Sequence, residues 1–369
     1  MKIDTHVINT LLNERSIDLH IRNKYEIKIQ DIPNFKILKL IDLRNKYLRI
    51  WRLLLFCSYF LVFFKVISQW AVSILVSFFP YKINEDEIFA YITVDSNKEI
   101  LEKSVLQACD YNFNYLLNSS ILISRALGTI AVTKLVIKNI VLFRTIFLMK
   151  KDIRKDLILH SINSFEMLLF SKFIIDNNGL KFVTDDHYQR WAYTLSILSK
   201  SFSIVQHGKL DSSIEFSSKF KNVSSVYVWD KKYEDKFSSY INVNKFNKAD
   251  ISRDLSQTKY GSECILIASS APHIIDEILF VKTFKKLSSL PLLVKLHPVH
   301  QYDSNKSILL QNSDYICSKD DFPNCKLFIS HSSALEDTYL KAGINILRIS
   351  EYNSISDAVD ESLRILDSK

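Results

Sequence analysis

Four short motifs in this sequence carry side chains that could bind an anion or move a proton. They are Asp-Asp-His at 185–187, Gln-His-Gly at 206–208, Lys-Leu-His-Pro at 295–298 and Ser-His-Ser-Ser-Ala-Leu-Glu at 330–336. Each follows a short apolar run typical of a buried β-strand. Histidine exchanges protons near neutral pH, while lysine and hydroxyl groups suit a phosphate. The motifs therefore indicate proton transfer and the binding of a phosphorylated ligand.

The first two motifs supply the candidate bases. His207 stands at the end of an apolar run and precedes one of only five glycines in the chain. Its imidazole suits a general base, and Gly208 would permit a tight turn. Asp186 is the alternative base, although an aspartate here could equally cap the following helix. The residues expected on the acceptor side are Gln206, Gly208 and His187.

The third motif is a candidate phosphate site. Lys295 and His297 are two residues apart on an expected strand, so their side chains share a face. Pro298 fixes the backbone directly after the histidine. The spacing between His297 and His300 does not indicate a metal pair, because nothing supplies obvious third and fourth ligands. The sequence thus predicts phosphate binding here and no metal site.

The fourth motif has two compatible interpretations. Ser332 and Ser333 precede an expected helix, whose first backbone N–H groups and dipole favour an anion. Glu336 could then reach a ribose. However, Ser333-x-x-Glu336 is also a capping box, which accounts for both residues without a ligand. We take Ser332, Ser333 and Glu336 as candidate donor-binding residues.

The elements that must position these motifs alternate between strand and helix. Strands are expected at 89–94, 181–184, 202–206 and 225–229, and again at 264–268, 291–296, 327–330 and 344–349. Helices are expected after 94 through Leu117, within 121–175, and at 187–200, 274–287, 333–342 and 353–366. This alternation predicts parallel sheets with helices on both faces.

The 369 residues suit two domains of ordinary size. We expect an N-terminal extension at 1–85, an acceptor domain at 86–245 and a nucleotide-donor domain at 260–369, with the polar segment 231–258 containing the linker. Ligands of open parallel sheets bind beyond the carboxyl ends of the strands. The four motifs would therefore meet in a cleft between two facing domains.

An apolar run from Leu53 to Phe79 contains a single charge, Lys65. Six basic residues and one acidic residue lie just before it, between 36 and 52. Three interpretations stay open: a pair of buried or interfacial helices, one transmembrane span, or a helix of the soluble core. The basic flank favours an anionic membrane surface. A second basic stretch at 134–155 is either a solvated helix face or another membrane-facing stripe.

Composition excludes several classes of protein. The net charge is +8, which suits an anionic partner, yet no nucleic-acid recognition motif accompanies it. Scarce glycine leaves neither of the usual glycine-rich phosphate loops. The five cysteines lack metal spacing and are expected to be reduced thiols of a cytoplasmic protein, and no secretory signal is evident.

At these residues the chain resembles the two-domain transferases of bacterial surface-polymer synthesis (GT-B fold). These include CDP-glycerol glycerophosphotransferases and bacterial sialyl-, polysialyl- and Kdo-transferases. Their His-Pro motif and following serine or threonine pair grip the donor phosphates, and here these look like His297-Pro298 and Ser332-Ser333. Their N-terminal base or acceptor motif looks like Gln206-His207-Gly208, with Asp186-His187 upstream. The resemblance covers roughly residues 180–350.

The resemblance implies an α/β protein of two Rossmann-like domains facing a cleft. The basic and apolar residues before 85 lead us to expect a helical, membrane-associating extension as well. The resemblance also implies a glycosyltransferase, without a cofactor, that uses a CMP- or CDP-linked sugar to extend a capsule or O-antigen polysaccharide. No Asp-x-Asp metal motif follows a suitable strand, so we expect the enzyme to be independent of metal. The acceptor would be a lipid-linked or polymeric glycan, and the enzyme would be peripheral to the inner membrane on its cytoplasmic side. Two alternatives remain: a CDP-alditol phosphotransferase, or a non-catalytic membrane-bound assembly protein.

Overall fold

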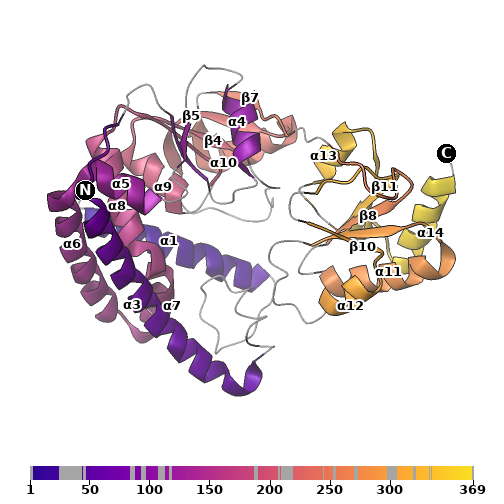
Figure 1. The fold of residues 1–369 in the computed structure, drawn as a ribbon, viewed down its shortest axis with the longest axis horizontal. Helices are drawn as coiled ribbons and strands as arrows, with labels where there is room; N and C mark the ends of the chain where they lie inside the picture. Colours follow the sequence, from indigo (N-terminus) through magenta and orange to yellow (C-terminus); the bar gives the residue numbers. More distant parts are fainter. Residues whose placement is uncertain are drawn as a thin grey trace. The chain divides into compact units, whose positions relative to one another are not determined.

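The computed structural model describes residues 3–24, 44, 47–83, 88–92, 97–106, 113–115, 119–186, 190–206, 208, 219–243, 245–251, 255–269, 273–296, 306–318, 321–331, 333 and 335–367. The chain divides into two compact units (Figure 1). Unit 1 comprises Met1–Ile41 and Tyr47–Asp250, and unit 2 comprises Asp42–Lys46 and Ile251–Lys369. Each contains a parallel sheet with helices, so the chain is an α/β protein.

Unit 1 has a seven-stranded sheet of order β2-β1-β3-β4-β5-β6, in which β7 also pairs with β5. All of these pairs are parallel. The strands are β1 (Ile88–Tyr91), β2 (Phe113–Tyr115), β3 (Lys181–Thr184), β4 (Phe202–Val205), β5 (Phe220–Val228), β6 (Ile241–Val243) and β7 (Phe246–Lys248).

The helices of unit 1 are α1 (Ile3–Lys24), α3 (Trp51–Val76), α4 (Lys98–Leu106), α5 (Ser119–Leu127), α6 (Thr129–Phe147), α7 (Lys151–His160), α8 (Ser164–Asp176), α9 (Arg190–Leu198) and α10 (Glu234–Tyr240). An aromatic cluster joins them to the sheet: Phe89 of β1 contacts Phe173 of α8, and Tyr91 lies 4.1 Å from Trp191 of α9 between ring centroids. Large buried rings of this kind contribute most of the apolar area of a core.

Helix α1 belongs to unit 1 and is fixed by buried charged groups. It contacts α7, α8 and α9. Glu14 of α1 accepts hydrogen bonds from Arg190 at the start of α9, and His160 at the end of α7 lies 3.2 Å from the same carboxylate. Arg15 pairs with Asp156 of α7 at 2.8 Å. Apart from Arg44, which is assigned to unit 2, the described residues of the expected extension 1–85 therefore belong to the first unit.

Unit 2 has a five-stranded parallel sheet of order β10-β9-β8-β11-β12. The strands are β8 (Ile265–Ala268), β9 (Leu292–Lys295), β10 (Tyr315–Cys317), β11 (Leu327–Ser330) and β12 (Asn345–Arg348). The helices are α11 (Ile274–Leu287), α12 (Lys306–Gln311), α13 (Glu336–Lys341) and α14 (Ile355–Asp367). Ile265 and Ile267 pack on α11, α12 and α14, whereas Leu266 packs towards α13, as the alternation of strand side chains requires.

Most expected elements are confirmed, with three corrections. The helix expected through Leu117 ends at Leu106, and β2 follows it. The segment 231–258, expected to contain the linker, includes the boundary between the units at Asp250 and Ile251, but it also contains α10, β6 and β7 of unit 1, which were not predicted. In unit 2, α12 and β10 were not predicted. Strands β2, β6 and β10, which the sequence analysis missed, have only three residues each, too few for a hydrophobic period to show.

The apolar run forms one helix, α3, which continues through Lys65. Within the described ranges, two helical stretches are long and apolar enough to cross a membrane: Leu48–Val76, which is mostly exposed, and Lys151–Asp176, which is mostly buried. A bent pair, Ser120–Leu127 with Thr129–Phe147, could form a third. It turns by 120° at Gly128, whose φ of +75° favours glycine.

Candidate functional site

The strand order of unit 2 reverses between β8 and β11. Strand β9, which follows β8 in the chain, lies towards one edge of the sheet. Strand β12, which follows β11, lies towards the opposite edge. Such a point of reversal, at the carboxyl ends of the strands, is where open parallel sheets bind ligands. Residues directly after β8 and β11 are therefore the first candidates for a site in this unit.

Both strands end in a serine that hydrogen-bonds a buried glutamate of the helix that follows. Ser269, after β8, donates to Glu277 of α11 at 2.5 Å. Ser330, the last residue of β11, donates to Glu336 of α13 at 2.5 Å. These bonds fix the strand–helix junctions after β8 and β11, since a charged acceptor makes a hydrogen bond stronger.

The Glu336 carboxylate accepts several hydrogen bonds from other residues of the protein. One carboxylate oxygen also accepts the backbone N–H of Ser333 at 3.0 Å, and the Ser333 hydroxyl accepts the N–H of Leu335. This is the expected capping arrangement. The other oxygen accepts from Arg348 at 2.7 Å. Glu336 is buried, so its observed role is to join β11, α13 and β12.

Lys295 is also held by the protein, in a way that differs from the expected phosphate contact. Its ammonium donates to the backbone carbonyls of Ser318 at 2.9 Å and Asp321 at 2.6 Å. It lies 4.3 Å from the centroid of the Phe322 ring. The side chain therefore fixes the turn after β10, on the far side of β8 from β11.

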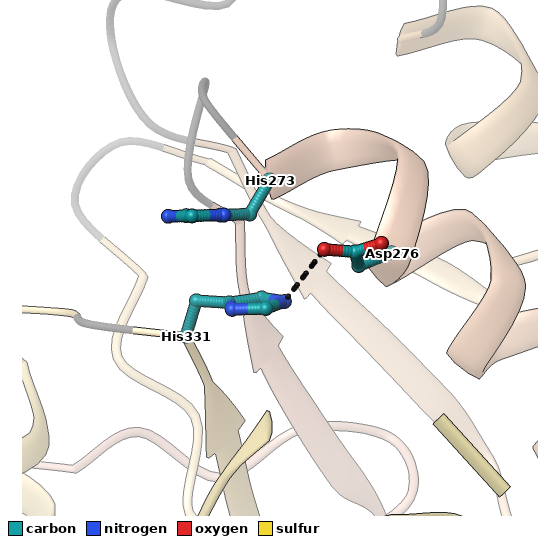
Figure 2. A group of neighbouring side chains, drawn as sticks. All are labelled: His273, Asp276 and His331. Atoms are coloured by element: carbon teal, nitrogen blue, oxygen red, sulfur yellow. Dashed lines mark ion pairs between the residues drawn. The ribbon is translucent and has the colours of Figure 1, made fainter. Parts of the chain in front are cut away.

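Three side chains with metal-binding or proton-transfer chemistry lie close together beyond the ends of β8 and β11 (Figure 2). They are His273 and Asp276, from the start of α11, and His331, directly after β11; one ligand atom from each lies within 4.8 Å of the others. The two imidazole rings stack with centroids 4.3 Å apart. Burial and the neighbouring His273 lower the pKa of His331, although Asp276 opposes them. His331 is therefore neutral at physiological pH.

In unit 1 the strand order reverses between β1 and β3. Beyond these strands Asn97 donates to Asp185 at 2.6 Å, and both side chains are buried. Asp186 accepts the backbone N–H groups of Trp191 at 2.9 Å and Ala192 at 3.2 Å. The Asp186 carboxylate thus caps α9, as one of the two sequence interpretations proposed.

Gln206 and Gly208 close the end of β4. The Gln206 amide donates to the Gly208 carbonyl at 2.9 Å and accepts the Trp229 N–H at 3.0 Å. Gly208 has no positive φ, and no atom lies within 4 Å of where a Cβ would stand. Among the described residues, therefore, nothing requires a glycine at this position.

Five predicted site residues lie outside the described part of the chain: His187, His207, His297, Pro298 and Ser332. Of the others, the structure brings Ser333 and Glu336 together in unit 2, while Lys295 lies two strands from them. Asp186, Gln206 and Gly208 belong to unit 1. Sequence reasoning missed His273, Asp276 and His331. A histidine and a carboxylate three residues apart at a helix start, directly after a strand, were the available signal.

No protein-family model matches the chain, and a search of curated proteins finds no significant match.

Proposed function

We propose that this chain is a glycosyltransferase that takes a sugar from a nucleotide-activated donor, with CMP- or CDP-linked sugars as the expected donors. The observation that carries the proposal is the reversal of strand order between β8 and β11 in unit 2, where polar side chains follow both strands. The His297-Pro298 and Ser332-Ser333 motifs follow strands of the same sheet in sequence. Sheets of this order bind nucleotides at this edge.

The proposed roles follow from this placement. His297, Ser332 and Ser333 would contact the donor phosphates and neutralise charge on the leaving nucleotide. His207 would remove the acceptor proton. The capping contacts of Asp186 and the carbonyl contacts of Lys295 favour structural roles for these two side chains. In the proposed arrangement, two Rossmann-like units of the GT-B kind would supply donor and acceptor sites, and the acceptor would be a lipid-linked or polymeric glycan of a capsule or O-antigen.

We also propose that unit 1 binds the cytoplasmic surface of the inner membrane through α3 and α6. One side of α3 packs on α5, α6, α7 and α8, and Trp70 donates to Asn139 of α6. The exposed apolar side chains of the two helices are Leu53, Phe56, Phe60, Leu61, Phe64, Ile67, Val72 and Leu75 of α3 and Ile130, Ile137, Ile140, Val141 and Phe147 of α6. This apolar surface supports an interfacial helix whose other side is held by protein.

Hydrogen exchange measured with and without nucleotide tests the donor site. CMP, CDP or their sugar conjugates should slow exchange in peptides covering the β8–α11 and β11–α13 junctions. A donor at about 100 times its Kd should also stabilise the protein by about 2.7 kcal/mol. If no nucleotide protects these peptides, the donor proposal is wrong.

A transfer assay separates the proposed enzyme from its alternatives. Release of free CMP or CDP on adding acceptor glycan, with the sugar found in the polymer, supports glycosyl transfer. Transfer of an alditol phosphate from a CDP-alditol, with release of CMP, would instead identify a phosphotransferase. Binding without turnover of any donor would favour the non-catalytic assembly protein.

A further inference from the structure

We propose that His273, Asp276 and His331 form a binding site for a divalent transition-metal ion, Zn²⁺ or a chemically similar ion, in unit 2. This inference does not depend on the proposed transferase activity. It departs from the expectation of metal independence, which rested on motifs in the linear sequence.

The donor set fits the proposed ion. Two imidazole nitrogens and one carboxylate oxygen are ligands that Zn²⁺, Co²⁺ and Ni²⁺ accept, whereas Mg²⁺ prefers a shell of oxygens. Metal binding requires an imidazole nitrogen with its lone pair available. The Nε2 atom of His331 has no hydrogen-bond partner, so it is available to an ion.

The distance between His331 and Asp276 favours an ion between them. The Nε2 atom of His331 lies 3.7 Å from a carboxylate oxygen of Asp276, which is too long for a hydrogen bond. Two tetrahedral ligands that each lie about 2.0–2.1 Å from Zn²⁺ are themselves about 3.4 Å apart. The two atoms would therefore reach a shared ion by moving only a few tenths of an ångström.

His331 provides a second and independent observation. Its side chain is 93% buried, at 7% relative exposure, and its Nε2 atom has no hydrogen-bond partner. A buried polar nitrogen left without a partner costs about 1–3 kcal/mol, so such groups call for an explanation. In Figure 2 this nitrogen faces the Asp276 carboxylate. A bound ion would satisfy it.

The third ligand is able to turn towards the same point. Figure 2 shows the His273 ring lying over the His331 ring, with an interplanar angle of 11°. The nitrogen lone pair of an imidazole lies in the plane of its ring, so two parallel rings do not direct their lone pairs to one point. His273 must therefore rotate about its Cβ–Cγ bond to bind the same ion as His331. Among the described residues none donates a hydrogen bond to this ring or accepts one from it, and the side chain is only half-buried. Asp276 is half-exposed, which leaves a coordination position open to water or a ligand oxygen.

Titration of the full chain, purified without a polyhistidine tag and treated with EDTA, tests the site. Calorimetry with ZnCl₂ or CoCl₂ should show one ion per chain, and Co²⁺ should give the visible absorption of a tetrahedral complex. MgCl₂ at the same concentration should give no such binding. Affinity should fall as pH drops below about 6.5, because protons compete for the imidazoles.

Single substitutions locate the ion. His273→Ala, Asp276→Asn and His331→Ala should each weaken Co²⁺ binding about 100-fold or more, since losing even an outer-shell partner costs about 10–100-fold. His20→Gln, in α1 of unit 1, is the matched control and should bind as the wild type does. Circular dichroism checks that each variant is folded; His273 and Asp276 are less buried than His331, so their variants keep the test decisive if His331→Ala unfolds. Wild-type affinity in both His273→Ala and Asp276→Asn would overturn the proposal, as would a wild-type chain that binds neither Zn²⁺ nor Co²⁺.

Discussion

Arg190 and Glu14 form a buried ion pair that joins the first turn of α9 to α1. The Arg190 Nε atom donates to one carboxylate oxygen at 2.6 Å, and a terminal guanidinium nitrogen donates to the other. Both side chains are at most 8% exposed. Burial alone would raise the pKa of Glu14, but the Arg190 charge and hydrogen bonds from His160 and Arg190 lower it to about 2. This pair therefore couples the N-terminal helix to the sheet-bearing part of unit 1.

Replacing Glu14 with glutamine should destabilise unit 1 by about 3–5 kcal/mol, because it leaves a buried guanidinium without its counter-charge. Tryptophan fluorescence during urea unfolding reports on this unit alone, since all four tryptophans of the chain lie within it. Lys103→Gln, which removes an exposed pair with Glu99 on α4, is the control and should cost only about 0.2–1 kcal/mol. Equal effects of the two substitutions would contradict the proposed importance of the buried pair.

His160 should make the stability contributed by the contacts among Glu14, Arg190 and His160 depend on pH. Burial lowers the pKa of His160, but hydrogen bonds to Asp18 and Glu14 and their charges outweigh it, so the net shift is upward from 6.5. A raised pKa in the folded state means that the stabilisation is complete below about 6.5 and is lost as pH rises through the folded pKa. For Glu14 the stabilisation is complete above about 4.5 and is lost as pH falls towards 2.

The measurement compares the wild type with His160→Gln across this range. The difference in unfolding free energy should be largest at pH 5–6 and should shrink as pH rises above 6.5. Taking the difference matters because His6, also on α1, has its pKa lowered to about 4 by burial and contributes the opposite trend. A difference that grows with pH would contradict the charged state of His160 inferred from these contacts.

The sequence predicted the strands that carry the motifs because their apolar runs are bounded by polar residues. The runs at 181–184 and 327–330 match β3 and β11 residue for residue. It could not predict that Lys295 turns to the carbonyls of Ser318 and Asp321, because those acceptors belong to a strand and turn distant in sequence. His273 and His331 meet for the same reason: only the order of strands β8 and β11 brings them together.

Lys295→Met should lower the stability of unit 2 and leave donor affinity unchanged. Methionine keeps the apolar stem but removes the donor to two carbonyls, a loss of about 1.5–3 kcal/mol for hydrogen bonds to a charged group. Circular dichroism during urea unfolding, compared with tryptophan fluorescence, separates the two units. Lys286→Met, at an exposed position of α11, is the control. If Lys295→Met weakens nucleotide binding while its stability stays normal, Lys295 contacts the donor phosphates.

His207→Ala and Asp186→Asn should have different effects. If His207 is the base, its loss should lower kcat by about 10²–10⁴-fold with little change in donor affinity, and the wild-type rate should rise with pH near 6.5. Asp186→Asn keeps a side chain able to cap α9 and loses its negative charge at the helix N-terminus, so it should cost about 0.3–1 kcal/mol, measured by tryptophan fluorescence. If instead Asp186→Asn reduces turnover per folded molecule far more than His207→Ala does, the carboxylate is the base.

The last prediction concerns the stripe formed by Phe56, Phe60 and Phe64 on α3. These side chains follow one another at a spacing of four residues and are 59%, 51% and 67% exposed. Fully burying a phenylalanine contributes about 1.5–3 kcal/mol, so replacing all three by serine should weaken binding to vesicles at least about 100-fold. The opposite face of α3, which includes Val62 and Val66, stays packed, so the fold should be retained.

Flotation with vesicles containing phosphatidylglycerol measures this binding, and salt should weaken it because charge attraction is screened beyond about 8 Å. Serine at Ile275, Leu279 and Leu287, which are exposed on α11 of unit 2, is the matched control and should leave binding unchanged. If the triple-serine variant of α3 still floats like the wild type, this helix does not contact the membrane. If the wild type resists both high salt and alkaline extraction, α3 crosses the bilayer, since only an inserted span survives both treatments.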